Sequence, residues 1–264
     1  MILLGFDTAT HATVVALALG DGRVLHARDD PPPRAHPGHA TRLLGMADGL
    51  LREAGIHWPA LERIAVGMGP GRFTGLRVGI ATARGLAQAL AIDLAGVSTL
   101  EALAQEAARA RGAQDERILA VIDARRGEVF AGAFERAAGG HPGQQTLAPV
   151  TEPVAPPLAP EQLEDLLRSP VGLSGAQGRW LAVGDGAVLA RAYLEAAGAE
   201  VPPDDSPLHA VHGRAICELG AGAPPAASLE QILPDYRRMA DARERSQGAS
   251  SHEPAVLAQG VSSP

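Results

Sequence analysis

The chain contains the stretch Gly67-Met-Gly-Pro-Gly-Arg-Phe-Thr-Gly-Leu-Arg-Val-Gly79, on which the predicted fold depends. The apolar residues 64–68 predict a buried strand, and residues 75–90 have the length and composition of a helix. A glycine-rich loop between them would direct backbone N–H groups to a helix N-terminus, a geometry that attracts anions. The loop is not of the Walker A type, because the chain contains no lysine. Tight packing of strand against helix is the simpler explanation of the same glycines.

The composition indicates a protein with a substantial hydrophobic core and an acidic surface. Its 264 residues are 46% hydrophobic, which suffices for one large domain or two small ones. The formal net charge of −7 argues against a freestanding nucleic-acid-binding protein, because such proteins are usually basic. The single Cys217 excludes an internal disulfide and suits a reducing compartment. The first residues contain no basic region and Asp7 interrupts their apolar run, so we expect no signal peptide. No apolar run reaches membrane-spanning length, and we expect a cytoplasmic protein.

The same strand pattern occurs once in each half of the chain. An apolar strand that ends in Asp7 begins a three-stranded meander over residues 2–27. A second apolar strand, which ends in Asp123, begins a similar unit of strand, turn and strand over residues 118–134. An internal duplication of this kind predicts two similar structural units.

After each of these units, helices alternate with single strands, a pattern that predicts mixed sheets covered by helices. The expected helices cover residues 41–54, 75–90, 100–111, 160–168, 187–197 and 209–219, and the expected strands cover residues 64–68, 94–97 and 181–183. We expect four regions: a first lobe (1–112), a second lobe (113–205), a C-terminal helix and strand that return toward the first lobe (206–238), and a disordered tail (239–264).

Several motifs, in order along the chain, resemble those of the bacterial TsaB (YeaZ) family. The glycine-rich loop resembles the hallmark loop of that family in Gly69, Pro70, Gly71, Phe73 and Thr74. Four further motifs extend the resemblance: Asp7-Thr8-Ala9-Thr10, Gly96-Val97-Ser98-Thr99-Leu100, Ile122-Asp123-Ala124-Arg125-Arg126-Gly127-Glu128-Val129 and Pro234-Asp235-Tyr236-Arg237-Arg238. Together they cover roughly residues 1–240. The chain departs from the family at Arg72, where the family commonly has Ser.

The resemblance implies both a fold and a function. The fold would be the two-lobed, duplicated α/β fold of the actin-like ATPases and sugar kinases, which is RNase H-like in each lobe. The chain would be a noncatalytic dimerisation and activation subunit of the complex that transfers threonylcarbamoyl to the adenosine beside the anticodon of tRNA. Its partners would be a TsaD-type catalytic paralogue and a TsaE-type small ATPase, with tRNA reached only through the complex. No catalytic residue, cofactor or metal would belong to this chain.

Actin-like ATPases hold phosphate on two hairpins, and the counterparts of these hairpins are recognisable here. Their polar residues are Asp7, Thr8 and Asp123. A close approach of the backbone to phosphate favours glycine, but Ala9 occupies that place in the first hairpin. In the second hairpin, Arg125 and Arg126 precede the glycine. We therefore interpret the two hairpins as a degenerate nucleotide site.

The chain offers weak candidates for a metal site or a nucleophile. His36 and His39 suggest a metal pair, but Pro37 and Gly38 break the helix that would place both rings on one face. Cys217 lies in an apolar helical pattern, which is typical of an inert core thiol. We expect neither a metal site nor a nucleophile.

Two helices of the first lobe have the features of a partner-binding surface. The first has an apolar arc wider than one packed face requires, and the second has a small residue at every fourth position from Gly75. Packing of both features within the lobe is the alternative explanation. If the chain pairs as the family does, the expected contact residues are His39, Leu43, Met46, Leu50, Gly75, Arg77, Gly79 and Ala83. The same helices leave open a homodimer when the partner is absent.

Three other functions compete with the subunit hypothesis. A small-molecule kinase of the actin-like class would use Asp7 or Asp123 with Mg-ATP, but the hairpins lack the phosphate-binding glycines. A peptidase would need a metal pair, which the sequence does not offer. A direct tRNA-binding module would use four arginines near the end of the chain, against the net acidity: Arg237, Arg238, Arg243 and Arg245.

Overall fold

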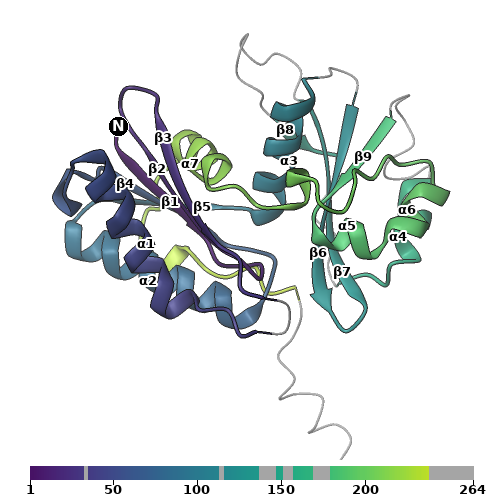
Figure 1. The fold of residues 1–264 in the computed structure, drawn as a ribbon, viewed down its shortest axis with the longest axis horizontal. Helices are drawn as coiled ribbons and strands as arrows, with labels where there is room; N and C mark the ends of the chain where they lie inside the picture. The colour runs from purple at the N-terminus through teal and green to yellow at the C-terminus, as the bar shows by residue number, and fades with distance from the viewer. Residues whose placement is uncertain (33–34, 113–115, 137–146, 151–156, 169–178, 238–264) are drawn as a thin grey trace, which may run out of the picture.

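The computed structural model describes residues 1–32, 35–112, 116–136, 147–150, 157–168 and 179–237. Two lobes lie side by side, each built around one sheet (Figure 1). The predicted tail and residues 113–115, at the expected boundary between the lobes, lie outside the described residues. No described helix is long and apolar enough to cross a membrane.

The first lobe contains a five-stranded sheet with the order β3-β2-β1-β4-β5. Its strands are β1 (Leu3–Asp7), β2 (Thr13–Ala18), β3 (Val24–Asp29), β4 (Arg63–Gly67) and β5 (Asp93–Val97). The first three strands form an antiparallel meander, and β4 and β5 run parallel to β1 after helical crossovers. The buried apolar side chains of β1, β2 and β4 alternate between the two faces of this sheet, so each face needs a covering layer.

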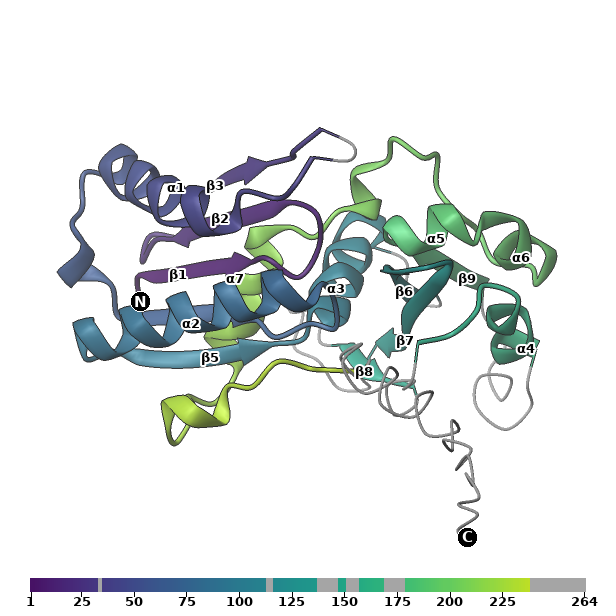
Figure 2. The ribbon, with the colours of Figure 1, turned by 90° about the horizontal axis from the view of Figure 1, so that it is seen from below.

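Three helices supply the layers on the first sheet. The helices α1 (His39–Ala54) and α2 (Phe73–Leu90) cover one face, and α7 (Gly213–Gly222) covers the other (Figure 2). The chain then runs along the β5 edge, where the Ala226 N–H donates to the Leu94 carbonyl at 2.9 Å. The described part of the C-terminal region therefore closes the first lobe.

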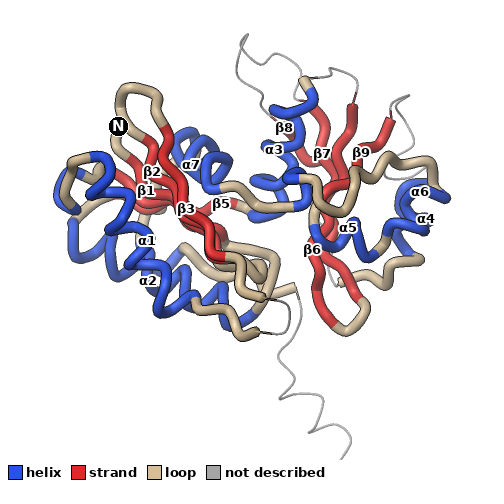
Figure 3. The backbone as a smooth tube through the Cα atoms, in the orientation of Figure 1, coloured by secondary structure: helices blue, strands red, loops and turns tan. Residues whose placement is uncertain are grey.

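The second lobe repeats the meander and its parallel neighbour. Its sheet has the order β8-β7-β6-β9, formed by β6 (Glu116–Arg125), β7 (Glu128–Arg136), β8 (Leu147–Pro149) and β9 (Arg179–Val183). β6, β7 and β8 are antiparallel, and β9 runs parallel to β6. This repetition confirms the predicted duplicated, two-lobed α/β fold, and Figure 3 shows the two sheets and their helical layers.

The helices of the second lobe lie on both faces of its sheet. One face packs against α3 (Thr99–Arg111), and the other packs against α4 (Gln162–Arg168), α5 (Asp185–Leu189) and α6 (Arg191–Ala196). Although α3 precedes the expected boundary in sequence, most of its buried apolar side chains belong to the second lobe's core, and Ala102 packs with α7 and the first sheet. It also contacts α7, so these two helices join the sheets at the centre of the molecule (Figure 1).

Several expected elements differ in detail. The helix expected over 187–197 is two short helices, because the chain turns at Ala190 between α5 and α6. The short strand β8 was not expected from the sequence. The region 206–238 was expected to contain a strand, but its described residues form α7 and two 3₁₀ turns, Pro207–His209 and Leu229–Gln231.

Substitution of alanine for glycine in α7 should destabilise the protein at Gly220 and leave its stability nearly unchanged at Gly222. A Cβ atom on Gly220 would lie 2.2 Å from the Ala65 Cβ in β4, whereas a Cβ on Gly222 meets nothing within 4 Å. Gly220→Ala should lower the free energy of unfolding by about 1–3 kcal/mol through overpacking. Gly222→Ala should change it by less than about 0.5 kcal/mol. Urea denaturation of both variants measures the free energy of unfolding. An equal change in the two variants would contradict the packing of α7 on β4.

Candidate functional site

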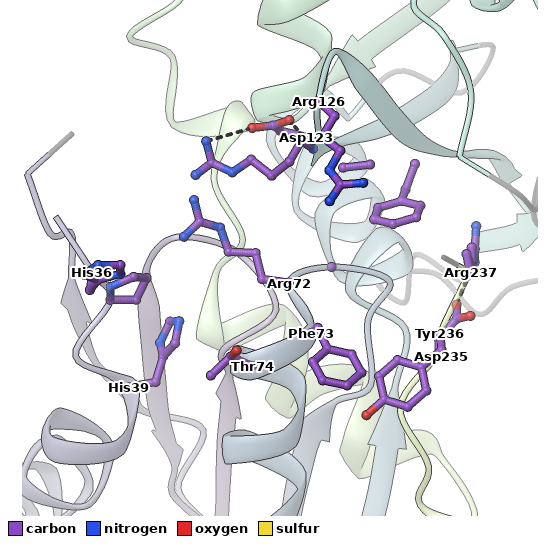
Figure 4. Close-up of a pocket in the computed structure, with 16 residues that line it drawn as sticks. His36, His39, Arg72, Phe73, Thr74, Asp123, Arg126, Asp235, Tyr236 and Arg237 are labelled. Atoms are coloured by element: carbon purple, nitrogen blue, oxygen red, sulfur yellow. Dashed lines mark hydrogen bonds and ion pairs between the residues drawn. The ribbon is translucent and has the colours of Figure 1, made fainter. Parts of the chain in front are cut away.

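A pocket of about 720 Å³ opens between the lobes (Figure 4). Phe130 of β7 and four segments form its walls: residues 36–39 before and at the start of α1, residues 71–75 around the start of α2, residues 123–126 at the β6–β7 turn, and residues 235–237 near the end of the described chain. The family loop and the second predicted hairpin therefore meet in one place, as does the closing motif.

The family loop is held from two sides by hydrogen bonds. The Gly69 N–H donates to the Thr99 hydroxyl at 3.1 Å, and the Thr99 N–H donates to the Gly69 carbonyl at 2.8 Å. On the other side, the Arg72 N–H donates to the Ala9 carbonyl at 2.7 Å. A Cβ on Gly71 would lie only 2.3 Å from that carbonyl oxygen, so the β1–β2 turn touches the loop backbone directly.

The small residues at the start of α2 pack against the turn after β1. A Cβ on Gly75 would lie 1.9 Å from the Thr8 carbonyl oxygen, and one on Gly79 would lie 2.3 Å from the Thr8 hydroxyl. The Thr8 hydroxyl donates to the Gly75 carbonyl at 2.8 Å, and Ala83 further along the stripe is fully buried. The stripe of small residues thus serves the packing of α2 onto its own sheet.

Asp7 lies beneath the loop with no exposed surface. One carboxylate oxygen accepts from the Ala9 N–H at 2.7 Å, and the other accepts from the Thr99 hydroxyl at 2.7 Å. A Cβ on Gly67 would lie 1.8 Å from that second oxygen. Burial raises the pKa of Asp7, although both hydrogen bonds act to lower it. Because both oxygens are engaged and sealed, this carboxylate does not reach a ligand in the pocket.

The β6–β7 turn presents its residues to the pocket in a strained conformation. Arg125 and Arg126 have φ angles of 67° and 59°, a left-handed region that costs non-glycine residues about 1–3 kcal/mol each. Asp123 accepts from the Arg125 N–H at 2.7 Å, and the Arg125 guanidinium lies 3.5 Å from the same carboxylate. The Asp123 N–H donates to the Asp185 carboxylate at 2.9 Å. Asp123 is therefore engaged with its own turn and with the start of α5.

An aromatic and cationic cluster connects α2 to the closing motif. The Arg77 guanidinium carbon lies 3.8 Å above the Phe73 ring centroid, and its Nε–H donates to the Tyr236 hydroxyl at 2.9 Å. The Phe73 and Tyr236 ring centroids are 5.1 Å apart, and both rings remain 40–45% exposed. The Asp235 N–H donates to the Met68 carbonyl at 2.8 Å, which fixes this segment beside the loop.

The two histidines before α1 occupy different environments. His36 is exposed, whereas His39 is 4% exposed and its Nδ1 lies 2.9 Å from the Thr13 hydroxyl. Burial lowers the pKa of His39, and the neighbouring His11 lowers it further, against Asp29 and the Thr10 carbonyl. Among the described residues, no three His, Cys, Asp or Glu side chains come together as metal ligands would.

Other candidate groups are structural. Cys217 packs beneath β1, and burial raises the pKa of its thiol to about 12. Arg237, one of the four arginines that a tRNA-binding module would use, has a side chain that is 5% exposed and pairs with Asp235 at 2.9 Å. Its three companions, Arg238, Arg243 and Arg245, lie outside the described residues.

The residues expected to contact a partner divide into two groups by their burial in the chain. Six of them are buried within the first lobe: His39, Leu43, Leu50, Gly75, Gly79 and Ala83. Met46 is half-buried in the same core, and Arg77 is exposed. Most of the small and apolar residues chosen from the sequence thus pack within the lobe.

The outer faces of α1 and α2 carry a second set of small residues that the sequence analysis did not single out. On α1 these are Thr41, Gly45 and Gly49, and on α2 they are Ala81, Gly85 and Ala89. Leu44 beside them is 48% exposed. The period of four that indicated a stripe on α2 occurs on both of its faces, so the sequence signal was present but ambiguous.

Comparisons with known proteins relate these features to a family. A family model described as TsaD: tRNA N6-adenosine threonylcarbamoyltransferase matches residues 31–148. The chain is 38% identical over 188 residues to the tRNA threonylcarbamoyladenosine biosynthesis protein TsaB of Escherichia coli (strain K12), covering 70% of this chain and 72% of that protein. It is 32% identical over 136 residues to the TsaB protein of Bacillus subtilis (strain 168), covering 51% and 56% of the two chains.

A solved structure extends the similarity to the fold. It is a Pseudomonas aeruginosa protein described by its similarity to peptidase YeaZ, and it shares 35% sequence identity with this chain. The two structures match with a TM-score of 0.69 over 90% of this chain and 99% of that one. The similarity therefore includes both lobes.

The stability of the protein relative to an Asp7→Asn variant should fall as the pH rises. With a native pKa above the ordinary value of 3.8, the folded protein keeps a proton that the unfolded chain has released. The stabilising contribution is full below the unfolded pKa and is lost as the pH rises through the native pKa, by about 1.4 kcal/mol for each pH unit between the two pKa values. Urea denaturation of both proteins from about pH 4 to about pH 8 gives the difference. If the stability of the protein relative to the variant instead rose with pH, the hydrogen bonds would outweigh burial in setting the pKa of Asp7.

Proposed function

The chain belongs to the TsaB family of tRNA threonylcarbamoyladenosine biosynthesis proteins, and on that premise we propose that it is a noncatalytic subunit that pairs with a TsaD-type paralogue. The outer face of α1 and α2 would form the contact, in place of the buried stripe that the sequence suggested. Pairing would activate the partner, which carries out the transfer of threonylcarbamoyl to tRNA.

The observation that carries this proposal is the set of glycines on the outer helix face. A Cβ atom on Gly45, Gly49 or Gly85 would meet nothing within 4 Å. Glycine inside a helix costs about 0.5–1 kcal/mol relative to alanine, so each glycine needs a reason. Gly75 and Gly79 have that reason inside the lobe, because Thr8 touches them. The outer glycines lack a reason within the described chain, and close approach of a partner's helices would supply one.

The similarity of residues 31–148 to another family indicates the kind of partner. Residues 31–148, which include α1 and α2, match the model described for TsaD. A partner of that family would present a similar pair of helices, so the two pairs could pack about a pseudo-twofold axis as a four-helix arrangement. The same symmetry allows a homodimer of this chain when the partner is absent.

The state of the candidate catalytic groups supports the noncatalytic role. Asp7 is sealed beneath the loop, and Asp123 is engaged with Arg125. The raised pKa of Cys217 makes its thiol a poor nucleophile at neutral pH. In this proposal the protein acts in the cytoplasm, a TsaE-type ATPase joins the pair, and tRNA is bound through the complex. A kinase that uses Mg-ATP would instead need Asp7 to become exposed or Asp123 to be released from Arg125.

A charge placed on the outer face of α2 should weaken the pairing. Ala81 is an exposed helical alanine on this face, and Ala221 is an exposed helical alanine on α7. With the same organism's TsaD-type protein, Ala81→Glu should raise the Kd by about tenfold or more, because it would bury an unpaired carboxylate. The matched control Ala221→Glu should leave the Kd unchanged.

Calorimetric titration measures the pairing, and a tRNA modification assay with the reconstituted complex measures its consequence. Both the Kd and the modification rate should respond to Ala81→Glu alone. Wild-type affinity in that variant would remove the outer face of α2 from the interface. Mg-dependent ATP turnover by the isolated chain would reject the noncatalytic role and favour the kinase.

A further inference from the structure

The pocket between the lobes contains a buried histidine nitrogen that lacks a hydrogen-bond partner among the described residues. His39 is 4% exposed and lines the pocket, and its Nε2 bonds to none of these residues. A Cβ on Gly75 would lie 3.3 Å from this nitrogen, so it sits beside the first turn of α2. Figure 4 shows the ring directed into the pocket, beside Thr74. Buried polar atoms are in most cases hydrogen-bonded, and the pocket can admit a partner for this nitrogen.

The same turn of α2 offers backbone donors without acceptors in the described chain. α2 has 18 residues, and its first turn has neither a side-chain cap nor an acidic residue. The N–H groups of Phe73, Thr74 and Gly75 make no hydrogen bond to a described residue. These groups and the helix dipole favour a negative charge at this end. The unpaired His39 Nε2 and the unpaired backbone N–H groups therefore face the same part of the pocket.

The charge of the pocket also favours an anion. Four arginines and two aspartates line it, which gives a formal charge of +2 in a chain whose net charge is −7. Asp123 pairs with Arg125, and Asp235 pairs with Arg237. The Arg72 guanidinium has no ion pair with a described residue, and Figure 4 shows it reaching from the start of α2 toward the β6–β7 turn. Arg72 is thus positioned to neutralise a charged ligand.

Aromatic rings at the pocket indicate the rest of the ligand. Phe73 and Tyr236 lie beside each other at its wall, with ring planes tilted by 30° and 40–45% of their surfaces exposed, and Phe130 lines it from the second lobe. Exposed rings of this kind bind the flat faces of nucleobases. The Arg77 guanidinium already covers one side of the Phe73 ring and holds the pair in place.

We propose that this pocket binds a nucleotide, with its phosphate at the N-terminus of α2 and its base against Phe73 and Tyr236. The phosphate would accept hydrogen bonds from His39 Nε2–H, from the N–H groups of α2's first turn, and from Arg72. When the Thr13 hydroxyl donates to Nδ1, the neutral His39 ring carries its proton on Nε2 as this arrangement requires. Asp7 takes no part, which distinguishes this site from that of a Mg-ATP kinase.

Calorimetric titration of the full chain with AMP, orthophosphate and adenosine tests the proposal. AMP should bind most tightly and orthophosphate detectably, and adenosine should bind at least about tenfold more weakly than AMP. Adenosine binding as tight as AMP binding would overturn the phosphate site. Failure of both AMP and orthophosphate to bind would overturn it as well.

Substitutions in the pocket identify the residues responsible. Arg72→Gln and His39→Asn should each weaken AMP binding by about tenfold, because asparagine keeps the Nδ1 contact with Thr13 but loses the Nε2 donor. His39→Gln, whose amide reaches the Nε2 position, should keep most of the affinity. The control Arg42→Gln, on the exposed side of α1, should bind as the wild type does. Thermal unfolding of each variant verifies folding, and unchanged affinity in folded Arg72→Gln and His39→Asn would refute the assignment.

The nucleotide could be free or could be the end of a nucleic acid strand. A short 5′-phosphorylated oligoribonucleotide that competes with AMP and binds more tightly would assign the site to a strand end. Weaker binding of the oligonucleotide would assign it to a free nucleotide. An oligonucleotide that binds without competing with AMP would count against a strand end at this pocket.

Discussion

The rest of the structure depends on one close contact. The family loop and the start of α2 form one side of it, and the end of β1 with the turn that follows forms the other. Added Cβ atoms on Gly67, Gly71, Gly75 and Gly79 would all lie within 2.3 Å of atoms in residues 7–9. Only glycine leaves room at these positions for the backbone of Thr8 and Ala9 and for the side chains of Asp7 and Thr8. The hydrogen bonds of Thr99 to Asp7 and to Gly69 then attach the start of α3 to the same point. Because α3 packs on the second sheet, this contact also positions the second lobe.

This contact separates the carboxylate at the end of β1 from the space between the lobes. In an actin-like enzyme these two regions are combined. The carboxylate at the end of β1 is sealed by the loop, so the first hairpin has lost access to a ligand. The space between the lobes remains, but its donors come from α2, His39 and the arginines. The inner face of α2 is committed to the sheet, and its outer face remains available to a partner. The proposed subunit role and the proposed nucleotide site therefore use different surfaces of one helix.

Local sequence signals predicted the features that depend on short-range order. The glycine-rich loop, the two meanders and most helices follow from apolar periodicity and turn residues, which the chain displays over a few residues at a time. The Thr99–Asp7 hydrogen bond joins residues 92 positions apart and has no local signal. The inner and outer faces of α2 could not be distinguished, because Gly75, Gly79 and Ala83 repeat with the same period as Ala81, Gly85 and Ala89. Small residues do not indicate which face of α2 is buried. The inner face is the one that Thr8 contacts at Gly75 and Gly79.

The most direct test of the central claim is hydrogen–deuterium exchange of the chain with and without the same organism's TsaD-type protein. The account predicts added protection of the backbone amides of α1 and α2, while α4 and α6 on the far side of the second lobe exchange as in the free chain. Protection confined to the second lobe, or no change in α1 and α2 at saturating partner, would contradict it.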